Sequence, residues 1–407
     1  MSTKLVNVFY HKNSSKLKVG RLALDNRKIY FEYDKDFLKS GIELSPYKLP
    51  LKEGVFSDSD HLFDGLFGLF ADSLPDGWGR LLLDRYLMNQ GYQLSQISPL
   101  DRLMLIGKYG IGALSYEPII ESSDDTCEID LDDLASSSLE ILRGNDEKNI
   151  ATLLQNNGSS SGARPKIMIQ INENNQFLSA NQPLQKDYEH YMVKFSSSND
   201  HHEMGKLEFL YSQMAKDSGI EITDTKLLVG EKNSYFAIKR FDRTQDKRVH
   251  IHSLAALVHT DFRIPSVDYD DILTVTLHLT KDINEVIKVY KLAVFNLFTH
   301  NRDDHAKNFS FLLDDKNSWK FAPAYDLTFS YGPGGEHSTT YLNEGKNPTV
   351  EHLEKLGQKH RIKEYKKIIE EIKYVVSQFK KYAKNVELSP KYTEEIFRHF
   401  CIRCKNL

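Results

Sequence analysis

The chain has 407 residues, of which 40% are hydrophobic and 27% are charged, an ordinary balance for a globular protein that buries a large core. Its net charge of −4 gives no support for nucleic acid or an acidic membrane surface as a direct partner. Three cysteines in so long a chain exclude a disulfide-rich scaffold and favour a reducing, cytoplasmic location. The first residues lack the apolar core of a signal peptide, and the sequence contains no run long and apolar enough to cross a bilayer.

Residues 1–118 are predicted to form a mixed α and β subdomain. The runs "LVNVFY" and "KIYFEY" have strand composition and are separated by turn residues. The following stretch "DHLFDGLFGLFADSLPDGWGRLLLDRYLMNQ" has helical character, with a break near Pro75. The acidic stretch "SSDDTCEIDLDD" (122–133) contains few core residues, so that it fits a linker or the solvated edge of one continuous domain equally well.

Residues 119–265 are predicted to form a β-rich lobe with one helix. Ile167, Ile169 and Ile171 recur at every second position, which is the spacing of a strand. Two further runs, "HYMVKF" and "SYFAIKRFDR", also have strand composition. Between them, "KLEFLYSQMAKDSG" carries its apolar side chains on one helical face and stops at Gly219.

Residues 266–407 are predicted to form a mostly helical lobe. Apolar residues from Val286 to Phe298 recur every three or four positions and predict a buried helix that ends at His300. A charged amphipathic helix, "KEYKKIIEEIKYVVSQFKKYAKN", follows towards the end of the chain. A β-rich part followed by a helical part indicates two lobes, and the cleft between them is a natural place for a ligand.

The segment "RDDHAKNFSFLL", from Arg302 to Leu313, carries the clearest chemical pattern. Asp303 and Asn308 have the spacing of the Arg-Asp-x4-Asn catalytic loop of protein kinases. In such a loop the aspartate orients an attacking hydroxyl and accepts its proton, whereas the asparagine binds a magnesium ion on the nucleotide phosphates. The pattern therefore indicates phosphoryl transfer.

A hairpin is predicted directly after this loop. The runs "FSFLL" (309–313) and "WKFAPA" (319–324) flank a turn, and their pairing would bring Asn308 and Asp326 to the same end of the hairpin. A carboxylate beside an amide suits magnesium, a hard ion that prefers oxygen ligands. Asp326 would then take the part of the metal-binding aspartate that follows the kinase catalytic loop.

Three features upstream follow the order found in kinases. "GSSSGARPK" (158–166) is a loop of small residues whose N–H groups could approach phosphates, although it also fits a flexible surface loop. Lys194 lies in a strand and Glu208 on the next helix, and both would be solvent-exposed by default. In kinases a strand lysine contacts the nucleotide phosphates and pairs with a helical glutamate, so that we expect Lys194 to pair with Glu208.

The chain resembles the HipA-type serine/threonine kinase toxins of bacterial toxin–antitoxin systems. "FADSLPDGWGRLLLDRYL" and "LIGKYGIGALSYEP" are similar to the N-terminal subdomain of that family, and "SSSGARPK" is similar to its Ser-x-x-Gly loop and Pro-Lys pair. "YFAIKRFDR", "NRDDHAKNFS" and "APAYDL" resemble its Arg-Phe-Asp-Arg strand, catalytic motif and metal motif. The resemblance covers nearly the whole chain and implies an α+β, two-lobed, protein-kinase-like fold. Two departures are Asp304, which places a second charge beside Asp303, and the run of three serines from Ser159 to Ser161.

The resemblance also implies ATP and Mg²⁺ as cofactors and gives individual residues their roles. Asp303 would be the catalytic base, and Asn308 and Asp326 would be the magnesium ligands. Lys194 would contact the ATP phosphates, and Lys307 could neutralise charge on the transferring phosphoryl group. With the loop backbone that covers the phosphates, the residues expected to bind the nucleotide are Ser159, Ser160, Ser161, Gly162, Ala163, Lys194 and Lys307.

Regulation, substrate and partner are likewise expectations from the resemblance. Autophosphorylation of Ser159, or alternatively of Ser160, would shut the enzyme down, because the added charge would lie where the nucleotide phosphates must sit. The expected substrate is an aminoacyl-tRNA synthetase. The expected partner is a HipB-like helix-turn-helix antitoxin, through which any contact with DNA would be indirect.

Two other functions fit parts of the sequence. A kinase-like scaffold or corepressor bound to a DNA-binding antitoxin would need no catalysis, whereas a small-molecule phosphotransferase would share the Asp-x4-Asn spacing. The N-terminal region and the Ser-x-x-Gly loop speak against the second of these. Near the C-terminus, His399, Cys401 and Cys404 could bind zinc, but the sequence contains no second cysteine pair, so that cysteines packed in a helix are expected. His305 is expected to pack in the loop, and Arg240 and Asp242 are expected to form ion pairs.

Overall fold

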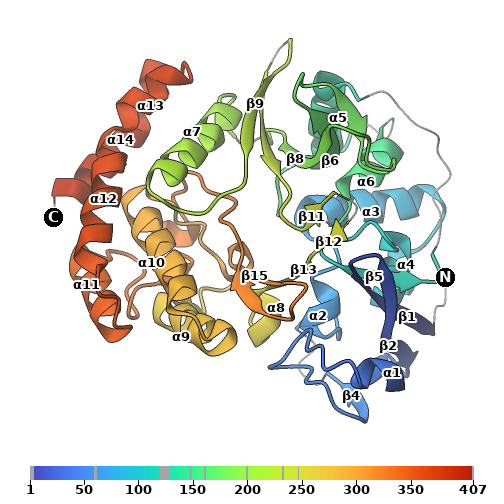
Figure 1. Cartoon of the computed structure of the whole chain (residues 1–407). Helices are drawn as coiled ribbons and strands as arrows, with labels where there is room; N and C mark the ends of the chain where they lie inside the picture. The colour runs from blue at the N-terminus through green and yellow to red at the C-terminus, as the bar shows by residue number, and fades with distance from the viewer. Residues whose placement is uncertain are drawn as a thin grey trace.

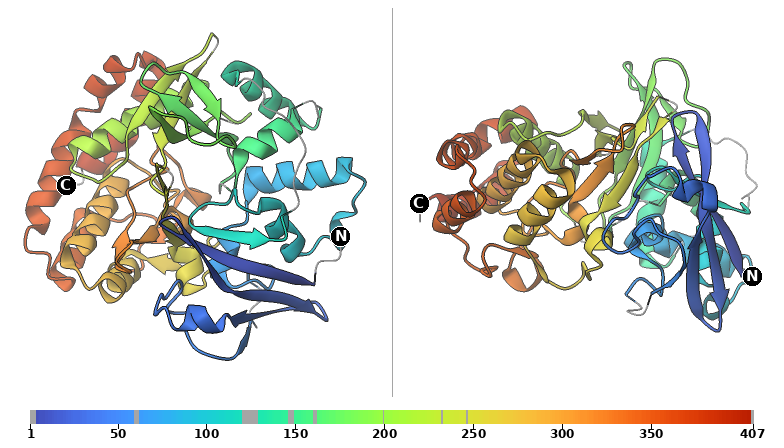
Figure 2. Two further views of the ribbon diagram at one scale, coloured as in Figure 1. Left: turned by 45° about the vertical axis from the view of Figure 1, so that its right-hand side comes forward. Right: turned by 60° about the horizontal axis from the view of Figure 1, so that its bottom comes forward.

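The computed structural model describes residues 4–58, 62–119, 129–145, 149–159, 162–198, 200–231, 233–245 and 247–405, with side chains up to residue 400. Figure 1 shows the N-terminal subdomain (residues 4–119) in blue to teal, the middle lobe (129–248) in green to yellow and the C-terminal lobe (249–405) in yellow to red. The turned views of Figure 2 place the N-terminal subdomain on the side of the molecule away from the C-terminal helices. None of the helices in the described part of the chain is long and apolar enough to cross a lipid bilayer.

The N-terminal subdomain is built on an antiparallel sheet with the strand order β4-β3-β2-β1-β5. The predicted runs "LVNVFY" and "KIYFEY" lie in β1 and β3, and the predicted break near Pro75 separates two helices. The elements are β1 (Leu5–Lys12), β2 (Ser15–Asp25), β3 (Lys28–Tyr33), α1 (Lys35–Leu38), β4 (Val55–Ser57), α2 (Gly68–Ala71), α3 (Gly77–Asn89), η1 (Leu94–Gln96), α4 (Pro99–Ile106) and β5 (Leu114–Glu117).

The middle lobe contains a second antiparallel sheet, in the order β7-β6-β8-β10-β9. Helices α5 and α6 pack against this sheet through a shared apolar core, and α7 contacts β9 and β10. The elements are α5 (Leu131–Arg143), α6 (Ile150–Asn157), β6 (Lys166–Asn172), β7 (Phe177–Ser179), β8 (Tyr188–Lys194), α7 (Met204–Asp217), β9 (Thr225–Val229), β10 (Ser234–Lys239), β11 (Arg243–Thr244) and β12 (Lys247–Arg248).

The C-terminal lobe is mostly helical and surrounds the largest apolar core that the structure describes. The predicted hairpin is confirmed, because β15 and β16 pair antiparallel, and β13 adds to the other edge of β15. The elements are β13 (His250–Ser253), α8 (Leu254–Val258), β14 (Val267–Asp268), α9 (Tyr269–Thr280), α10 (Ile283–Phe298), η2 (Ala306–Asn308), β15 (Ser310–Leu313), β16 (Trp319–Phe321), η3 (Pro333–Gly335), β17 (Thr339–Thr340), α11 (Val350–Lys359), α12 (Tyr365–Ser377), α13 (Phe379–Asn385) and α14 (Pro390–Lys405).

Two expectations about local structure need correction. The buried helix α10 ends at Phe298 and not at His300, because His300 adopts a left-handed backbone conformation with φ of 55° that cannot continue a helix. The acidic stretch 122–133 is not a linker throughout. Its last three residues form the first turn of α5, where Asp130 accepts a hydrogen bond from the backbone N–H of Asp133, and residues 120–128 lie outside the described part.

The N-terminal subdomain packs against both lobes. Trp78 of α3 is fully buried in the core of the middle lobe, whereas Leu313 and Trp319 of the C-terminal hairpin join the core of the N-terminal subdomain. At a third contact, a Cβ atom on Gly68 would lie 2.2 Å from the backbone oxygen of Ala256, so that only glycine permits this approach. The subdomain therefore borders the region where the two lobes meet.

Candidate active site

The catalytic loop is anchored to the core through Asp304. This carboxylate is buried and accepts hydrogen bonds from the Tyr269 hydroxyl (2.8 Å), His337 Nδ1 (3.0 Å) and the Ser338 N–H (2.9 Å). Asp304 therefore points away from the cleft, although the sequence suggested that it adds charge beside Asp303. Its role in the structure is to fix the loop that presents Asp303.

Arg302 anchors the other side of the same loop. Its buried guanidinium donates to the backbone carbonyls of Gly335 and Lys346. Asp303 lies between these two anchors with an exposed side chain, although it is not among the residues that line the cleft described below. Surrounding protein atoms raise the pKa of Asp303, and the nearby charge of Asp326 raises it further, against the opposing effects of His305 and Arg164. A raised pKa suits a group that must accept a proton.

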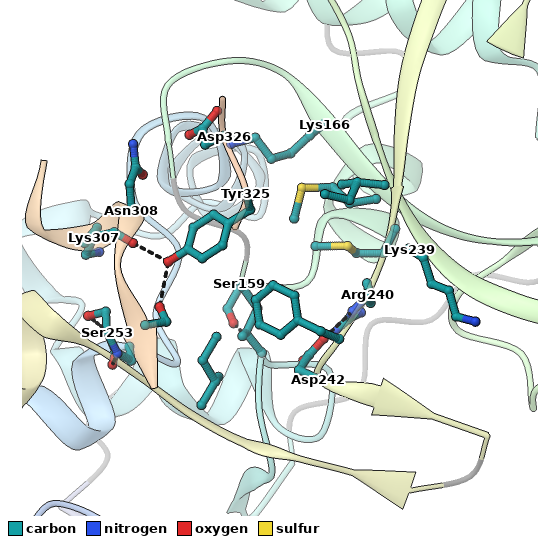
Figure 3. A pocket seen from close by; sticks show the side chains of 18 of the residues that line it. Ser159, Lys166, Lys239, Arg240, Asp242, Ser253, Lys307, Asn308, Tyr325 and Asp326 are labelled. Carbon is teal, nitrogen blue, oxygen red and sulfur yellow. Dashed lines mark hydrogen bonds and ion pairs between the residues drawn. The ribbon is translucent and has the colours of Figure 1, made fainter. Parts of the chain in front are cut away.

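Asn308 and Asp326 face the same cleft, as the hairpin predicted (Figure 3). The side-chain amide of Asn308 donates to the backbone oxygen of Asp303 (2.7 Å), which leaves its carbonyl oxygen to face a ligand. Burial alone would raise the pKa of Asp326, but Lys194 and Lys166 outweigh burial and hold this pKa well below its usual range. An ionised carboxylate and an amide oxygen are donors that fit magnesium.

Lys194 forms the predicted pair with Glu208 and also bonds Asp326. Its Nζ lies 3.2 Å from Glu208 Oε1 and 2.6 Å from Asp326 Oδ1, and the side chain is only 8% exposed. Arg164 also contacts Glu208, at 3.0 Å. The expectation that a strand lysine is solvent-exposed by default does not apply here, because this lysine connects the middle lobe to Asp326 of the C-terminal lobe.

Lys166 is a site residue that the sequence analysis did not assign. It begins β6, opposite Lys194 in the β6–β8 register, and lines the same cleft. Burial lowers the pKa of Lys166 to about 8 in spite of the nearby carboxylate of Asp326. The sequence signal for Lys166 was the Pro-Lys pair after the small-residue loop. Alternation along the strand, however, did not predict that the side chain of this lysine points into the cleft.

The predicted phosphate loop contacts the N-terminal subdomain. Ser159 is buried, and its hydroxyl oxygen accepts a hydrogen bond from the backbone N–H of Ile111 (2.7 Å). The N–H of Gly162 donates to Asp76 (2.5 Å). Ala163 is exposed, and Ser160 and Ser161 lie outside the described residues.

Lys307 also lines the cleft, where it is paired with Asp76. The two charged groups are 2.5 Å apart, and the Lys307 ammonium lies 4.5 Å from the centre of the Phe262 ring. Asp76 was not predicted as a site residue, although the run "FADSLPDGWGRLLLDRYL" that contains it carries part of the family resemblance. The hydroxyl of Tyr325 holds the Lys307 backbone by donating to its carbonyl oxygen (2.6 Å; Figure 3).

Of the remaining predicted residues, Arg240 and Asp242 line the cleft, whereas His305 and His399 are not among its lining residues. Arg240 and Asp242 form the expected ion pair, at 2.8 Å, and Arg243 joins them at 2.7 Å. The ring of His305 packs 5.7 Å from that of Phe262, as expected for a loop-anchoring histidine. The ring of His399 lies 5.1 Å from that of Tyr331, whereas the side chains of Cys401 and Cys404 are not among those described.

The cleft has two chemically different ends (Figure 3). One wall is apolar and is lined by Ile111, Met168, Met192, Ile238 and Phe241. The other end presents three lysines beside the oxygen donors, namely Lys166, Lys194 and Lys307. An apolar slot next to a cationic end has the chemistry needed to hold a flat base and a polyphosphate.

Comparisons with known proteins agree with this arrangement. Residues 7–117 match the family model described as HipA N-terminal domain, and residues 158–392 match the one described as HipA-like C-terminal domain. A solved HipA chain from Shewanella oneidensis MR-1, in a complex of the toxin–antitoxin system HipA and HipB with its operator DNA, aligns with a TM-score of 0.72 at 17% identity. The alignment covers 98% of this chain and 96% of that one. The predicted α+β, two-lobed HipA-like fold is thereby confirmed.

Two curated relatives from Sinorhizobium fredii (strain NBRC 101917 / NGR234) are also similar. "Putative kinase Y4dM" is 28% identical over 217 residues, which is 47% of this chain and 52% of that protein. "Putative kinase Y4mE" is 26% identical over 131 residues, which is 30% of this chain and 31% of that protein. The alignments thus span about half and about a third of these relatives.

Proposed function

Because the chain belongs to the HipA family, we propose that it is an ATP-dependent serine/threonine protein kinase that acts as the toxin of a toxin–antitoxin pair. The observation that carries this proposal is the position of Lys194, which bonds both Glu208 and Asp326 in a cleft also lined by Asn308. This is the set of charges that a kinase uses to hold a nucleotide and its metal.

In the proposed reaction, the base of ATP lies against the apolar wall and the triphosphate lies at the lysine-lined end. Asn308 and Asp326 would hold Mg²⁺, which neutralises phosphate charge when it is bound. The hydroxyl oxygen of a substrate serine or threonine attacks the γ-phosphorus, the bond to the β,γ-bridging oxygen breaks, and ADP leaves. Asp303 orients the hydroxyl and accepts its proton, and its raised pKa favours that transfer.

Substrate and partner follow from the family. We propose an aminoacyl-tRNA synthetase as the substrate, whose phosphorylation would halt translation, and the cytoplasm as the place of action. A HipB-like helix-turn-helix antitoxin is the proposed partner, supported by the Shewanella structure, in which HipA is bound to HipB and operator DNA. With its net charge of −4, the chain itself would contact DNA only through that partner.

Autophosphorylation of the phosphate loop is the proposed means of inactivation, with Ser159 as the first choice and Ser160 as the second. Ser159 is buried and hydrogen-bonded to Ile111, so its hydroxyl becomes a substrate only after the loop leaves its present position. A phosphate adds about −1.5 to −2 charges at neutral pH. Such a charge would repel the ATP phosphates and keep the loop out of the cleft.

The experiment that tests the proposal is phosphate transfer from labelled ATP to proteins of a bacterial lysate. The wild-type chain should label a protein and arrest growth on expression, whereas Asp303→Asn should lower transfer by about 10²- to 10⁴-fold, the usual contribution of a general base, and should not arrest growth. The alternative of a corepressor scaffold is favoured by the DNA complex of the Shewanella protein. It predicts instead that Asp303→Asn retains the full effect on growth.

A further inference from the structure

Asp76 of the N-terminal subdomain connects two phosphate-facing elements that belong to different lobes. It stands at the start of α3, but its carboxylate makes no hydrogen bond to that helix. One oxygen accepts from the N–H of Gly162 in the phosphate loop (2.5 Å), and the other contacts Nζ of Lys307 in the catalytic loop (2.5 Å). The Asp76 carboxylate, which would ordinarily cap its own helix, is thus bonded to the two loops instead.

The turn that follows Asp76 fits closely around the same glycine. The N–H of Trp78 donates to the backbone oxygen of Gly162 (3.0 Å), so that the turn binds both backbone polar groups of Gly162. Gly77 has a φ of +45°, and a Cβ atom there would lie 2.5 Å from the oxygen of Gly162. Only glycine satisfies both conditions, and the turn is therefore shaped to the phosphate loop.

Lys307 is held from three directions. Tyr325 binds its backbone oxygen, the Phe262 ring lies beside its ammonium group, and Asp76 supplies the charge partner. The Lys307 and Asp76 side chains are 11% and 18% exposed, so solvent screens this pair little. Burial raises the pKa of Asp76, but Lys307 and the Gly162 N–H outweigh burial, and the carboxylate stays ionised.

We propose that Asp76 is a positioning residue for phosphoryl transfer, which holds the Lys307 ammonium and the Gly162 backbone at the phosphate end of the cleft. The inference rests on the proposed kinase function and adds to it that the N-terminal subdomain completes the active site. Asp76 acts through Lys307 and touches no reacting atom. If the Lys307 ammonium group points in another direction, the rate of phosphoryl transfer should fall more than the affinity for ATP. The reason is that this positive charge contributes most in the transition state, where negative charge develops.

The test compares Asp76→Asn with Asp84→Asn in the full chain. Asp84 lies on the same helix and is also ion-paired, with Arg80 and Arg102, and it is therefore a matched control outside the cleft. Asp76→Asn should lower kcat by about 10- to 100-fold, the cost of a misplaced catalytic group, with KM for ATP changed by less than about threefold. Asp84→Asn should leave both constants unchanged. Equal kinetics for the two variants, or tighter ATP binding and faster transfer in Asp76→Asn, would overturn the proposal.

A double-mutant cycle with Lys307→Gln separates positioning from a purely structural effect. If Asp76 acts through Lys307, Asp76→Asn should change kcat by less than about threefold in the Lys307→Gln background. A full loss in both backgrounds would show that Asp76 does not act through Lys307 and would overturn the proposal.

Hydrogen exchange provides a readout that needs no activity. The Gly162 amide should exchange faster in Asp76→Asn than in Asp84→Asn, and unchanged exchange would contradict the positioning role. If the wild-type chain transfers no phosphate at all, the kinase assignment fails, whereas the exchange experiment still decides whether Asp76 holds the loop.

Discussion

The two loops that face the proposed phosphate site are held in different ways. The predicted catalytic loop is anchored within its own lobe, where Asp304 and Arg302 bond groups of the segment 335–346, and it reaches the N-terminal subdomain through Lys307. The described part of the predicted phosphate loop bonds the N-terminal subdomain at Ser159 and Gly162, and it bonds its own lobe through Arg164, which contacts Glu208. Contacts made inside one core are lost only when that core unfolds, whereas contacts between separate parts can open locally. The proposed active site therefore combines a firmly anchored catalytic loop with a phosphate loop whose contacts to the N-terminal subdomain can open locally.

The largest expected effect comes from breaking the ion pair between Asp326 and Lys194, which joins the C-terminal lobe to the middle lobe. Asp326→Asn removes the charge that pairs with Lys194 and one of the proposed magnesium donors. Magnesium-dependent ATP affinity should fall by roughly 100- to 1,000-fold, as expected when one member of a desolvated charge pair is truncated. Calorimetric titration with ATP, with and without EDTA, measures the effect. Asp315→Asn in the exposed hairpin turn is the control, and a variant that keeps metal-dependent binding would remove Asp326 from the site.

Breaking the anchor of the catalytic loop should affect the whole C-terminal lobe. Asp304→Asn places an amide donor where Tyr269 and His337 now donate to a buried carboxylate. We expect the free energy of unfolding to fall by about 2 kcal/mol, because hydrogen bonds to a buried charge are lost and donors are left unsatisfied. Urea denaturation followed by tryptophan fluorescence measures this, again with Asp315→Asn as the control. A stable variant would mean that the loop does not depend on this anchor.

The contrast between contacts within one part of the chain and contacts between separate parts explains what the sequence could and could not predict. The Asp303–Asn308 spacing and the hairpin are local patterns, and the structure confirms the hairpin and places Asn308 and Asp326 in one cleft. Lys194 and Glu208 could be paired because their order along the chain follows that of kinases. Asp76 is 231 residues from Lys307, and no local pattern connects two side chains so far apart. Lys166 was missed for another reason: a strand lysine is normally exposed, and only the surrounding carboxylates of the folded cleft make its burial tolerable.

A smaller and graded effect is expected from pH. Since burial lowers the pKa of Lys166 to about 8, the unliganded lysine loses its proton as the pH rises above this value. Bound phosphates favour the protonated, charged form of Lys166, so that above pH 8 the lysine must take up a proton when ATP binds. ATP affinity should therefore fall by up to about tenfold per pH unit above pH 8. Lys166→Arg, whose guanidinium stays charged, should flatten this dependence. An equally steep fall in that variant would assign the titration to another group.

The smallest effect is expected at Ser159, where the phosphate loop meets the N-terminal subdomain. Ser159→Ala deletes the acceptor of the Ile111 N–H, and the free energy of unfolding should fall by no more than about 1 kcal/mol, the worth of one neutral hydrogen bond. Because this contact joins the N-terminal subdomain to the middle lobe, amide exchange should increase at Ile111 and in the phosphate loop while the C-terminal lobe stays protected. Ser160→Ala is the natural control.

The same pair of variants sharpens the regulatory proposal. After incubation with ATP and magnesium, mass spectrometry should find phosphate on Ser159 in the wild-type chain and in Ser160→Ala. It should find none there in Asp303→Asn, which lacks the catalytic base. The phosphorylated form should bind ATP poorly, because the added charge of about −1.5 to −2 lies next to the nucleotide phosphates. An active kinase whose loop stays unmodified would show that the loop does not open far enough to become a substrate.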